Sequence, residues 1–276
     1  MRFLESILYA LVSGLTEILP VSSFAHRAIL LRLFGADGEM PILGFSVHAG
    51  ILLGLFFETR NLLRRLQKEH QLSLIPKRRR RRHPDIQSVM DISLIKTACI
   101  PLLLAFLLYP RTLQWRGQLH LVALFLIMNG LILHFPVYLP QGNKDSRSVT
   151  KLDALLFGAG SALSMLPGIS RIGAFSSVAV ARGVDTQQAL KWSLLFSYPA
   201  LLGYICFDIY GLFASGFAGV GFLVFLQGIV CTAAAFVGAR LAIILVRFIS
   251  VRAGLFGFSY YSWGAALFAF ILYMTI

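Results

Sequence analysis

A short polar stretch lies inside an otherwise apolar part of the chain, between Glu17 and His26. It contains a carboxylate at Glu17, hydroxyls at Ser22 and Ser23 and an imidazole at His26, with Pro20 in the middle. Ionisable groups at membrane depth are costly, so this pattern predicts a functional site that faces a cavity. Glu17, set among Leu and Ile residues, is expected to hold a divalent ion or to act as a base.

The spacing of Ser23 and His26 is compatible with two roles. Three residues apart on a helix that starts near Ser23, the two side chains would share one face. A serine beside an imidazole can be a nucleophile with its base. Ser22 and Ser23 can equally be capping residues of a helix that begins after Pro20. Both interpretations stay open on the sequence alone.

A second stretch, more than half the chain further on, resembles the first. Each has small and polar residues, then Leu-Pro, then a serine four residues after that leucine, which is Ser170 in the second stretch. Arg171 follows, and an arginine with free backbone amides at a helix start suits a phosphate group. We predict phosphate binding by Arg171, with Ser170, Gly168 and Ser22 as further contacts.

The elements that position these residues are membrane-spanning. The chain has 276 residues, of which 57% are hydrophobic, and its mean hydropathy is +0.76, values that exclude an ordinary soluble domain. We predict an all-α integral membrane protein, a polytopic bundle of inverted repeats with two re-entrant helix-break regions. The broken hairpins are expected at 2–34 and 152–182, and the full spans at 41–57, 91–109, 119–139, 187–212, 217–246 and 255–275.

A single transmembrane domain is expected over residues 1–276, with a first repeat at about 1–139 and a second at about 151–276. The loop at about 58–90 carries ten basic residues against three acidic ones. Cytoplasmic loops are enriched in Lys and Arg, so this loop is predicted to be cytoplasmic and both termini to lie outside. Anionic membrane lipids are a secondary contact for it, and we expect no nucleic-acid partner. His48, in the middle of a span, is a further candidate site residue.

These residues resemble the undecaprenyl-diphosphate phosphatase (bacitracin-resistance) family over essentially the whole chain. The similar segments are Gly14–Ser23 with His26, Val47–Gly50, Pro167–Arg171 with Gly173, and Phe196–Pro199. The resemblance implies an enzyme that converts a polyprenyl diphosphate lipid to the monophosphate and so recycles a carrier for bacterial cell-wall synthesis. It also implies help from Mg²⁺ or Ca²⁺, a multi-pass protein of the bacterial cytoplasmic (inner) membrane, and a site open to the outer (periplasmic) side.

By motif, the resemblance assigns catalytic roles to Ser23, His26 and Glu17, and phosphate binding to Arg171. Glu17 would also be the metal ligand, as the second acid of a family motif whose first acidic position is Ser13 here. Two further positions depart from the polar family pattern, namely Ile172 and Phe175. One lost carboxylate weakens a site for a hard cation.

Two alternatives remain from the sequence. The same pocket could move a polyprenyl-phosphate headgroup across the bilayer without cleaving it, or the chain could be a non-catalytic membrane partner or regulator. A homodimer is compatible with the sequence.

Overall fold

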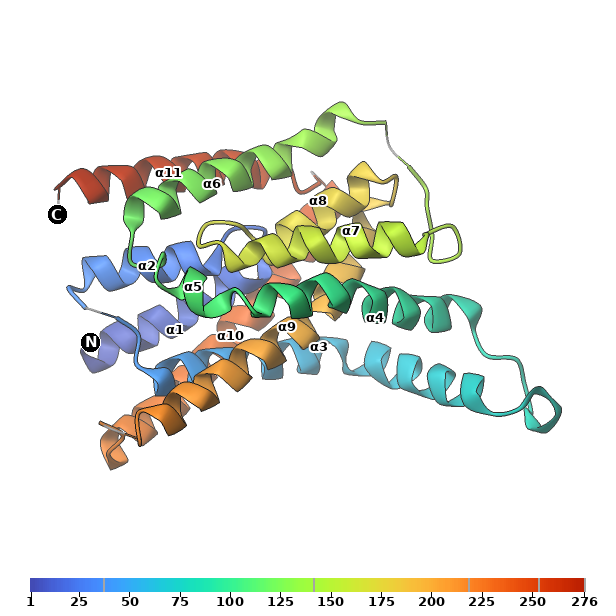
Figure 1. Ribbon diagram of the computed structural model, residues 1–276, viewed down its shortest axis with the longest axis horizontal. Helices are drawn as coiled ribbons and strands as arrows, with labels where there is room; N and C mark the ends of the chain where they lie inside the picture. Colours follow the sequence, from blue (N-terminus) through green and yellow to red (C-terminus); the bar gives the residue numbers. More distant parts are fainter. Residues whose placement is uncertain (37, 141, 218, 253, 276) are drawn as a thin grey trace.

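The computed structural model describes residues 1–36, 38–140, 142–217, 219–252 and 254–275. Over these residues the regular secondary structure is all helical, apart from one isolated bridge between Lys144 and Val184. Figure 1 shows the helices running roughly along the long axis of the molecule, with both termini at one end and the α3–α4 connection at the other. The predicted all-α membrane bundle is confirmed.

The helices of the first part of the chain are α1 (Phe3–Ile18), α2 (Ser23–Leu33), α3 (Pro41–Leu74), η1 (Lys77–Arg79), α4 (Ile86–Phe106), α5 (Tyr109–Leu113), α6 (Leu119–His134) and η2 (Phe135–Tyr138). Those of the second part are α7 (Lys151–Ala162), η3 (Leu163–Met165), α8 (Arg171–Ala181), α9 (Thr186–Ala214), α10 (Phe222–Arg252) and α11 (Gly257–Thr275).

The first re-entrant hairpin is made by α1 and α2. Leu19 has extended backbone angles (φ −71°, ψ 153°), as expected for a residue that precedes a proline, so α1 stops before Pro20. The next helix starts at once because Ser22 caps it, accepting a hydrogen bond from the Ala25 amide at 3.3 Å. The chain therefore returns to the end of the bundle from which it entered (Figure 1).

The second hairpin, α7 and α8, enters from the opposite end (Figure 1). Its break is at Pro167 and Gly168, and Gly168 has φ +149°, a conformation that side chains rarely adopt. A Cβ atom there would lie 2.4 Å from the Phe125 Cβ, so glycine also lets the break pack against α6. Both predicted re-entrant regions are present, while the relation of the two halves as inverted repeats stays a prediction.

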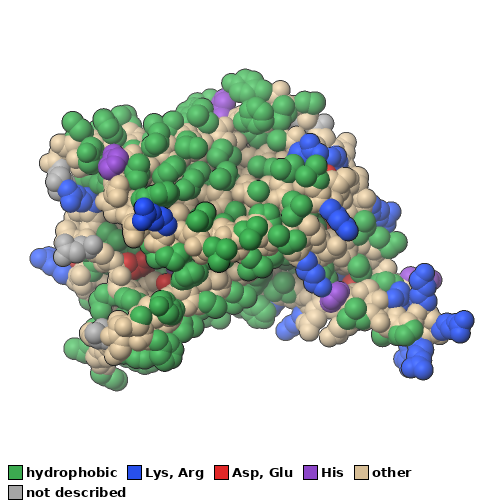
Figure 2. Space-filling model, in the orientation of Figure 1, with side chains coloured by type: hydrophobic (Ala, Val, Ile, Leu, Met, Phe, Trp, Pro, Cys, Tyr) green, Lys and Arg blue, Asp and Glu red, His purple; other side chains and the backbone are tan. Residues whose placement is uncertain are grey.

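Five helices of the described chain are long and apolar enough to cross a membrane, namely α3, α4, α6 with η2, α9 and α10. Many large apolar side chains on them are exposed, such as Leu103, Leu104 and Leu107 of α4 and the turn after it. Figure 2 shows hydrophobic side chains covering the middle of the visible face, while Lys and Arg gather at the end of the α3–α4 connection. This distribution is that of a multi-pass membrane protein.

The helix that contains the first predicted full span is longer than that span. The span expected to end at residue 57 continues as helix to Leu74, so much of the expected loop at 58–90 is helical. No proline interrupts the chain until Pro76, and polar contacts support the extension. Glu69 on α3 accepts two hydrogen bonds from Arg82, at 3.0 and 2.5 Å, and one from the Asp85 amide at 2.9 Å.

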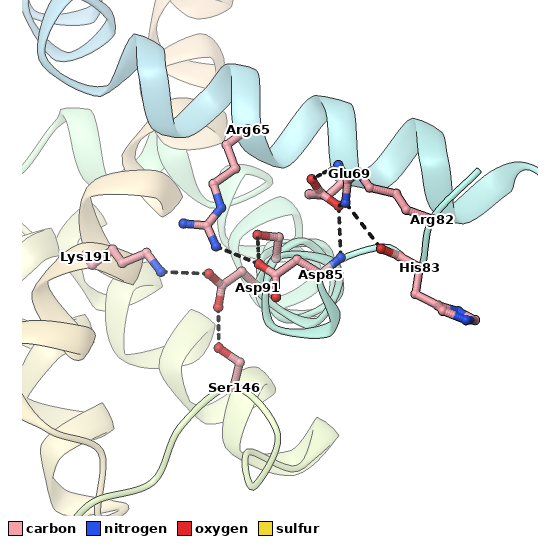
Figure 3. A network of polar contacts seen from close by, with 9 residues as sticks. Arg65, Glu69, Arg82, His83, Asp85, Asp91, Ser146 and Lys191 are labelled. Atoms are coloured by element: carbon pink, nitrogen blue, oxygen red, sulfur yellow. Dashed lines mark hydrogen bonds and ion pairs between the residues drawn. The ribbon is translucent and has the colours of Figure 1, made fainter. Parts of the chain in front are cut away.

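A polar network at this end ties the basic connection to the bundle (Figure 3). Asp85 accepts hydrogen bonds from Ser88 at 2.6 Å and from Arg65 at 2.8 Å. These bonds, the one from Ser88 first, favour the charged carboxylate and lower the pKa of Asp85 to about 2. The start of α4 is thereby held to α3.

Asp91, in the second turn of α4, joins three segments. It accepts hydrogen bonds from Ser146 at 2.5 Å and from Lys191 at 2.8 Å (Figure 3). It also accepts one from the Trp192 indole at 2.8 Å. The carboxylate is buried, and its pairing with a lysine and two neutral donors makes that burial tolerable.

Small residues let α1 and α3 approach α10 closely. A Cβ atom on Gly14 would lie 2.3 Å from the Ala235 carbonyl oxygen, and one on Gly50 would lie 2.3 Å from that of Thr232. Close backbone contact of this kind is the usual way in which membrane helices associate. It fixes α1, and with it the polar end that carries Glu17.

Candidate active site

The two helix breaks meet in the interior, and Asn129 of α6 bonds to both. Its side-chain oxygen accepts from the Ser170 amide at 2.8 Å. Its amide group donates to the Pro20 carbonyl at 3.4 Å and to the Ser262 hydroxyl at 2.9 Å. Asn129 is fully buried, so one side chain satisfies backbone groups that both breaks would otherwise leave unpaired.

An ion pair joins the two hairpins beside these breaks. Arg171, the first residue of α8, donates from Nη2 to Oε1 of Glu17, near the end of α1, over 2.6 Å. The side chains are 3% and 6% exposed, respectively. The other donors of this guanidinium, Nε and Nη1, are buried without a partner among the described residues. A buried arginine with unused donors is equipped to receive an anion.

Two serine hydroxyls face the same small pocket. Ser23 and Ser164 line it together with Glu17 and Arg171, and neither hydroxyl has a partner in the described part of the chain. The pocket is closed by Phe24, Tyr204 and apolar neighbours, and its volume is about 10 Å³. This is room for about one water molecule. We call it the reaction pocket.

Of the two serines that follow Pro20, one caps the helix and the other keeps its hydroxyl for the pocket, whereas Ser170 does both. Ser22 caps α2. Ser170 caps α8, accepting from the Gly173 amide at 3.2 Å, and also donates to the Leu19 carbonyl across the hairpins at 3.3 Å. Ser23 makes no capping bond and keeps its hydroxyl free. Ser170 lines the reaction pocket, whereas Ser22 does not.

The structure does not bring His26 into the reaction pocket. Its Nδ1 lies 2.6 Å from the Ser22 carbonyl oxygen, and its Nε2 lies 2.7 Å from the Tyr261 hydroxyl of α11. The two rings also stack, with their centroids 5.7 Å apart. His26 is therefore engaged at the back of the first break rather than with Ser23.

The remaining sequence candidates lie around the site. Ser13 is buried and donates to the Tyr9 carbonyl at 2.6 Å. Gly168 packs against α6, as described above. Ile172 and Phe175 are fully buried, and the Phe175 ring packs on Phe157 and Phe196, with centroids 5.6 and 5.3 Å away. The two apolar departures thus fill the core between helices instead of lining the pocket.

His48 belongs to a second polar cluster. Its Nδ1 lies 2.6 Å from Asp208 of α9 and its Nε2 lies 3.0 Å from Arg27 of α2. Arg27 also donates to the Tyr9 hydroxyl at 2.9 Å and forms an ion pair with Glu39. This cluster lies against a cavity of about 550 Å³, which is separate from the reaction pocket.

Several of these residues escaped the sequence prediction. Asn129 had one available signal, a lone amide within an apolar span, because polar side chains at membrane depth are rare and functional. Ser164 lies in the second polar stretch but looked like one small residue among several. No local pattern marks Tyr204, which reaches the reaction pocket only through tertiary packing.

Residues 6–268 match the family described as Bacitracin resistance protein BacA. The chain belongs to this family. It is 30% identical over 265 residues to an undecaprenyl-diphosphatase of Carboxydothermus hydrogenoformans, covering 95% of this chain and 94% of that protein. Proteins of the same name from Alkaliphilus metalliredigens and Thermodesulfovibrio yellowstonii are each 28% identical, covering 95% and 98% of this chain and 96% of their own lengths. The predicted family is thereby confirmed.

Proposed function

We propose that this chain is an undecaprenyl-diphosphatase, which converts undecaprenyl diphosphate to the monophosphate. The observation that carries the proposal is the reaction pocket, where two unused Arg171 donors lie beside the free hydroxyl of Ser23. Membership of the BacA family and the names of the relatives agree with it. The transport alternative has no comparable support. A buried hydroxyl in the same pocket as a carboxylate can act as a nucleophile with its base, and binding a headgroup for transport needs neither group.

In the proposed reaction the terminal phosphate enters between the two breaks. Arg171 binds its oxygens, offsetting charge that builds up in the transition state. The Ser23 oxygen attacks the terminal phosphorus and its proton passes to the Glu17 carboxylate. The bond from this phosphorus to the bridging oxygen breaks, and the lipid monophosphate leaves with that oxygen. Water then cleaves the phosphoserine bond and releases inorganic phosphate.

His26 is proposed to act through the first break. With its ring held between the Ser22 carbonyl and Tyr261, it fixes the residue that precedes the nucleophile. The direct proton transfer suggested by the family resemblance would need the ring to turn away from Tyr261. A variant Tyr261→Phe separates the two roles, because it frees the ring while leaving His26 in place.

The described donor set does not by itself make a cation site. Glu17 is its only carboxylate and is already paired with Arg171, Ser13 donates to backbone, and no group of three or more His, Cys, Asp or Glu that could hold a metal occurs in the described residues. Hard cations need several oxygen ligands. A requirement for Mg²⁺ or Ca²⁺ stays a prediction, which phosphate release by the wild type with and without these ions tests. Ser13→Glu supplies the missing carboxylate, and a gain in phosphate release is expected in the presence of the ions.

We propose the bacterial inner membrane as the location, with the α3–α4 connection in the cytoplasm. The run of basic residues at Lys77–Arg82 lies at this end, opposite both termini (Figure 1), and positive loops stay cytoplasmic. Anionic lipid headgroups are the proposed contact of that run. The first hairpin enters from the other end, so the site would open outward.

The test is phosphate release from undecaprenyl or farnesyl diphosphate by the purified chain. Ser23→Ala is expected to lower the rate at least about 100-fold. Ser161→Ala is the matched control, since Ser161 is another buried serine with an unpartnered hydroxyl and lies outside the reaction pocket. Equal rates for the two variants, or no release by the wild type across pH with or without Mg²⁺, would refute the proposal.

A further inference from the structure

A cavity of about 550 Å³ lies next to the reaction pocket, at the end of the bundle that carries both termini. Parts of α2, the α2–α3 connection, α5 with the turn after it, and the end of α9 line it, including Arg116 and Glu39. We call it the Arg116 cavity. Phe24 lines both spaces, so a single side chain forms a wall between them.

Most charges in this cavity already have partners. Arg27 pairs with Glu39 and donates to Tyr9, while Asp208 lies 2.6 Å from the Nδ1 atom of His48. These contacts explain how the buried cluster is tolerated. They do not involve Arg116, nor the exposed Arg32 that also lines the cavity, so two guanidinium groups of the described lining lie outside the cluster, and Arg116 is the one with buried donors.

Arg116 is held flat by aromatic rings. Its guanidinium carbon lies 3.4 Å from the centroid of the Phe24 ring and 4.8 Å from that of Tyr109. Its Nε and Nη2 atoms are buried and have no partner in the described part of the chain. Tyr109 also hydrogen-bonds to this side chain, while stacking on the rings leaves the Nε and Nη2 donors available to an acceptor.

One acceptor in the same cavity is also unused. The Oε1 atom of Glu39 is buried without a partner in the described chain, while Oε2 is occupied by Arg27. A complete ligand must therefore accept from Arg116 and donate to Glu39. A carboxylate can only accept and an ammonium group can only donate. A phosphate group that keeps one proton does both.

We propose that the Arg116 cavity is a second phosphate site, which binds a monoprotonated phosphate group between Arg116 and Glu39. Resting on the proposed function, the ligand is a product of the reaction, either inorganic phosphate or the phosphate of the lipid monophosphate. Both products carry the required acceptor oxygens and a titratable O–H. Phe24 separates this site from the reaction pocket, and Arg116 stacks on that same ring.

The experiment measures binding by calorimetry in the double variant Glu17→Gln/Arg171→Gln, whose reaction pocket lacks its guanidinium. Inorganic phosphate is expected to bind, and Arg116→Gln to weaken it about tenfold or more, as for loss of a charged hydrogen bond. Arg111→Gln is the matched control, since Arg111 is exposed on α5 and does not line the cavity. It is expected to leave binding unchanged. Sulfate, which has no proton to donate, is expected to bind more weakly than phosphate.

The two sources are separated by titrating farnesyl monophosphate alongside inorganic phosphate. Equal affinities identify a site for the free ion, and clearly tighter binding of the farnesyl compound identifies the lipid phosphate; either supports the site. Phosphate that does not bind, or that binds equally well after Arg116→Gln, overturns it. Hydrolysis by the wild type is scored separately, so a failed phosphate site leaves the phosphatase proposal standing.

A second pair of variants covers the case in which Arg116→Gln does not fold. Leu113 lines the cavity and is 42% exposed, so it tolerates a polar replacement. Leu113→Glu places a negative charge beside the ligand, whereas Leu113→Gln has nearly the same shape and no charge. Weaker phosphate binding for the Glu variant than for the Gln variant is expected, and equal binding contradicts the proposal.

Discussion

Neutralising one partner of the Glu17–Arg171 pair is the perturbation that tests the site most directly. Arg171→Gln leaves the Glu17 carboxylate buried at 6% exposure, and Glu17→Gln leaves the guanidinium at 3%. An uncompensated buried charge costs about 3–5 kcal/mol. In a chain of this size each kcal/mol moves the melting temperature by about 2–4 °C. Each single variant is therefore expected to melt on the order of 10 °C below the wild type.

The double variant Glu17→Gln/Arg171→Gln separates stability from function. It buries no charge, and two amides can still hydrogen-bond to one another, so most of the lost stability should return. Phosphate release should not return, because the guanidinium proposed to offset the phosphate charge is gone. The assays are thermal unfolding in detergent micelles and phosphate release from farnesyl diphosphate.

The control is another arginine–glutamate ion pair whose side chains are more exposed to solvent. Arg240 donates to Glu58 over 2.7 Å, with side chains 36% and 16% exposed, and single neutral variants there are expected to cost about 1 kcal/mol or less. If the Glu17 and Arg171 variants melt no lower than these controls, the burial argument fails. If the double variant hydrolyses the diphosphate at the wild-type rate, Arg171 does not bind the reacting phosphate.

Three further outcomes are expected from thermal unfolding. Asn129→Ala leaves the Ser170 amide and the Pro20 carbonyl unpaired, and each unpaired group costs about 1–3 kcal/mol of stability. The melting temperature should therefore fall by several degrees. An unchanged value would show that the breaks do not depend on this side chain. Phe175→Thr restores a hydroxyl in place of a core ring and should cost about 3 kcal/mol without raising phosphate release, whereas a gain in rate would place that position in the site. Asp85→Asn should be less stable than the wild type at pH 6, because the carboxylate with a pKa of about 2 contributes stability above its unfolded pKa near 4. That difference should shrink as the pH falls from 4 towards 2, and a constant difference would contradict the assigned pKa.

The breaks were predictable because their causes are local. A proline forces the preceding residue out of the helical region, and a serine just beyond it starts the next helix. Pro20 and Pro167 therefore predict both hairpins. The candidate site was also predictable, because ionisable residues beside these breaks are costly at membrane depth. The apolar run does not predict the extension of α3 to Leu74, because charged residues end a membrane segment but do not end a helix.

Contacts between distant elements could not be predicted. Nothing near His26 in the sequence indicates Tyr261, more than two hundred residues away, which turns the imidazole from Ser23. The pairing of Glu17 with Arg171 likewise depends on two hairpins that enter from opposite ends. The sequence motifs predict that Glu17, His26 and Arg171 lie near one another. The hydrogen-bond partner of each depends on side-chain packing, which the motifs do not determine.

Asn129 has a mechanical consequence. Because this one amide of α6 is bonded to the backbone of both breaks and to α11, neither hairpin can slide along the membrane normal without breaking bonds in the dry interior. A protein that carries its cargo by rocking one half against the other must give up such bonds in every cycle. In this chain the two hairpins share one hydrogen-bond partner where their breaks meet, so admission of a headgroup is expected to depend on movement of side chains and connecting segments around that point.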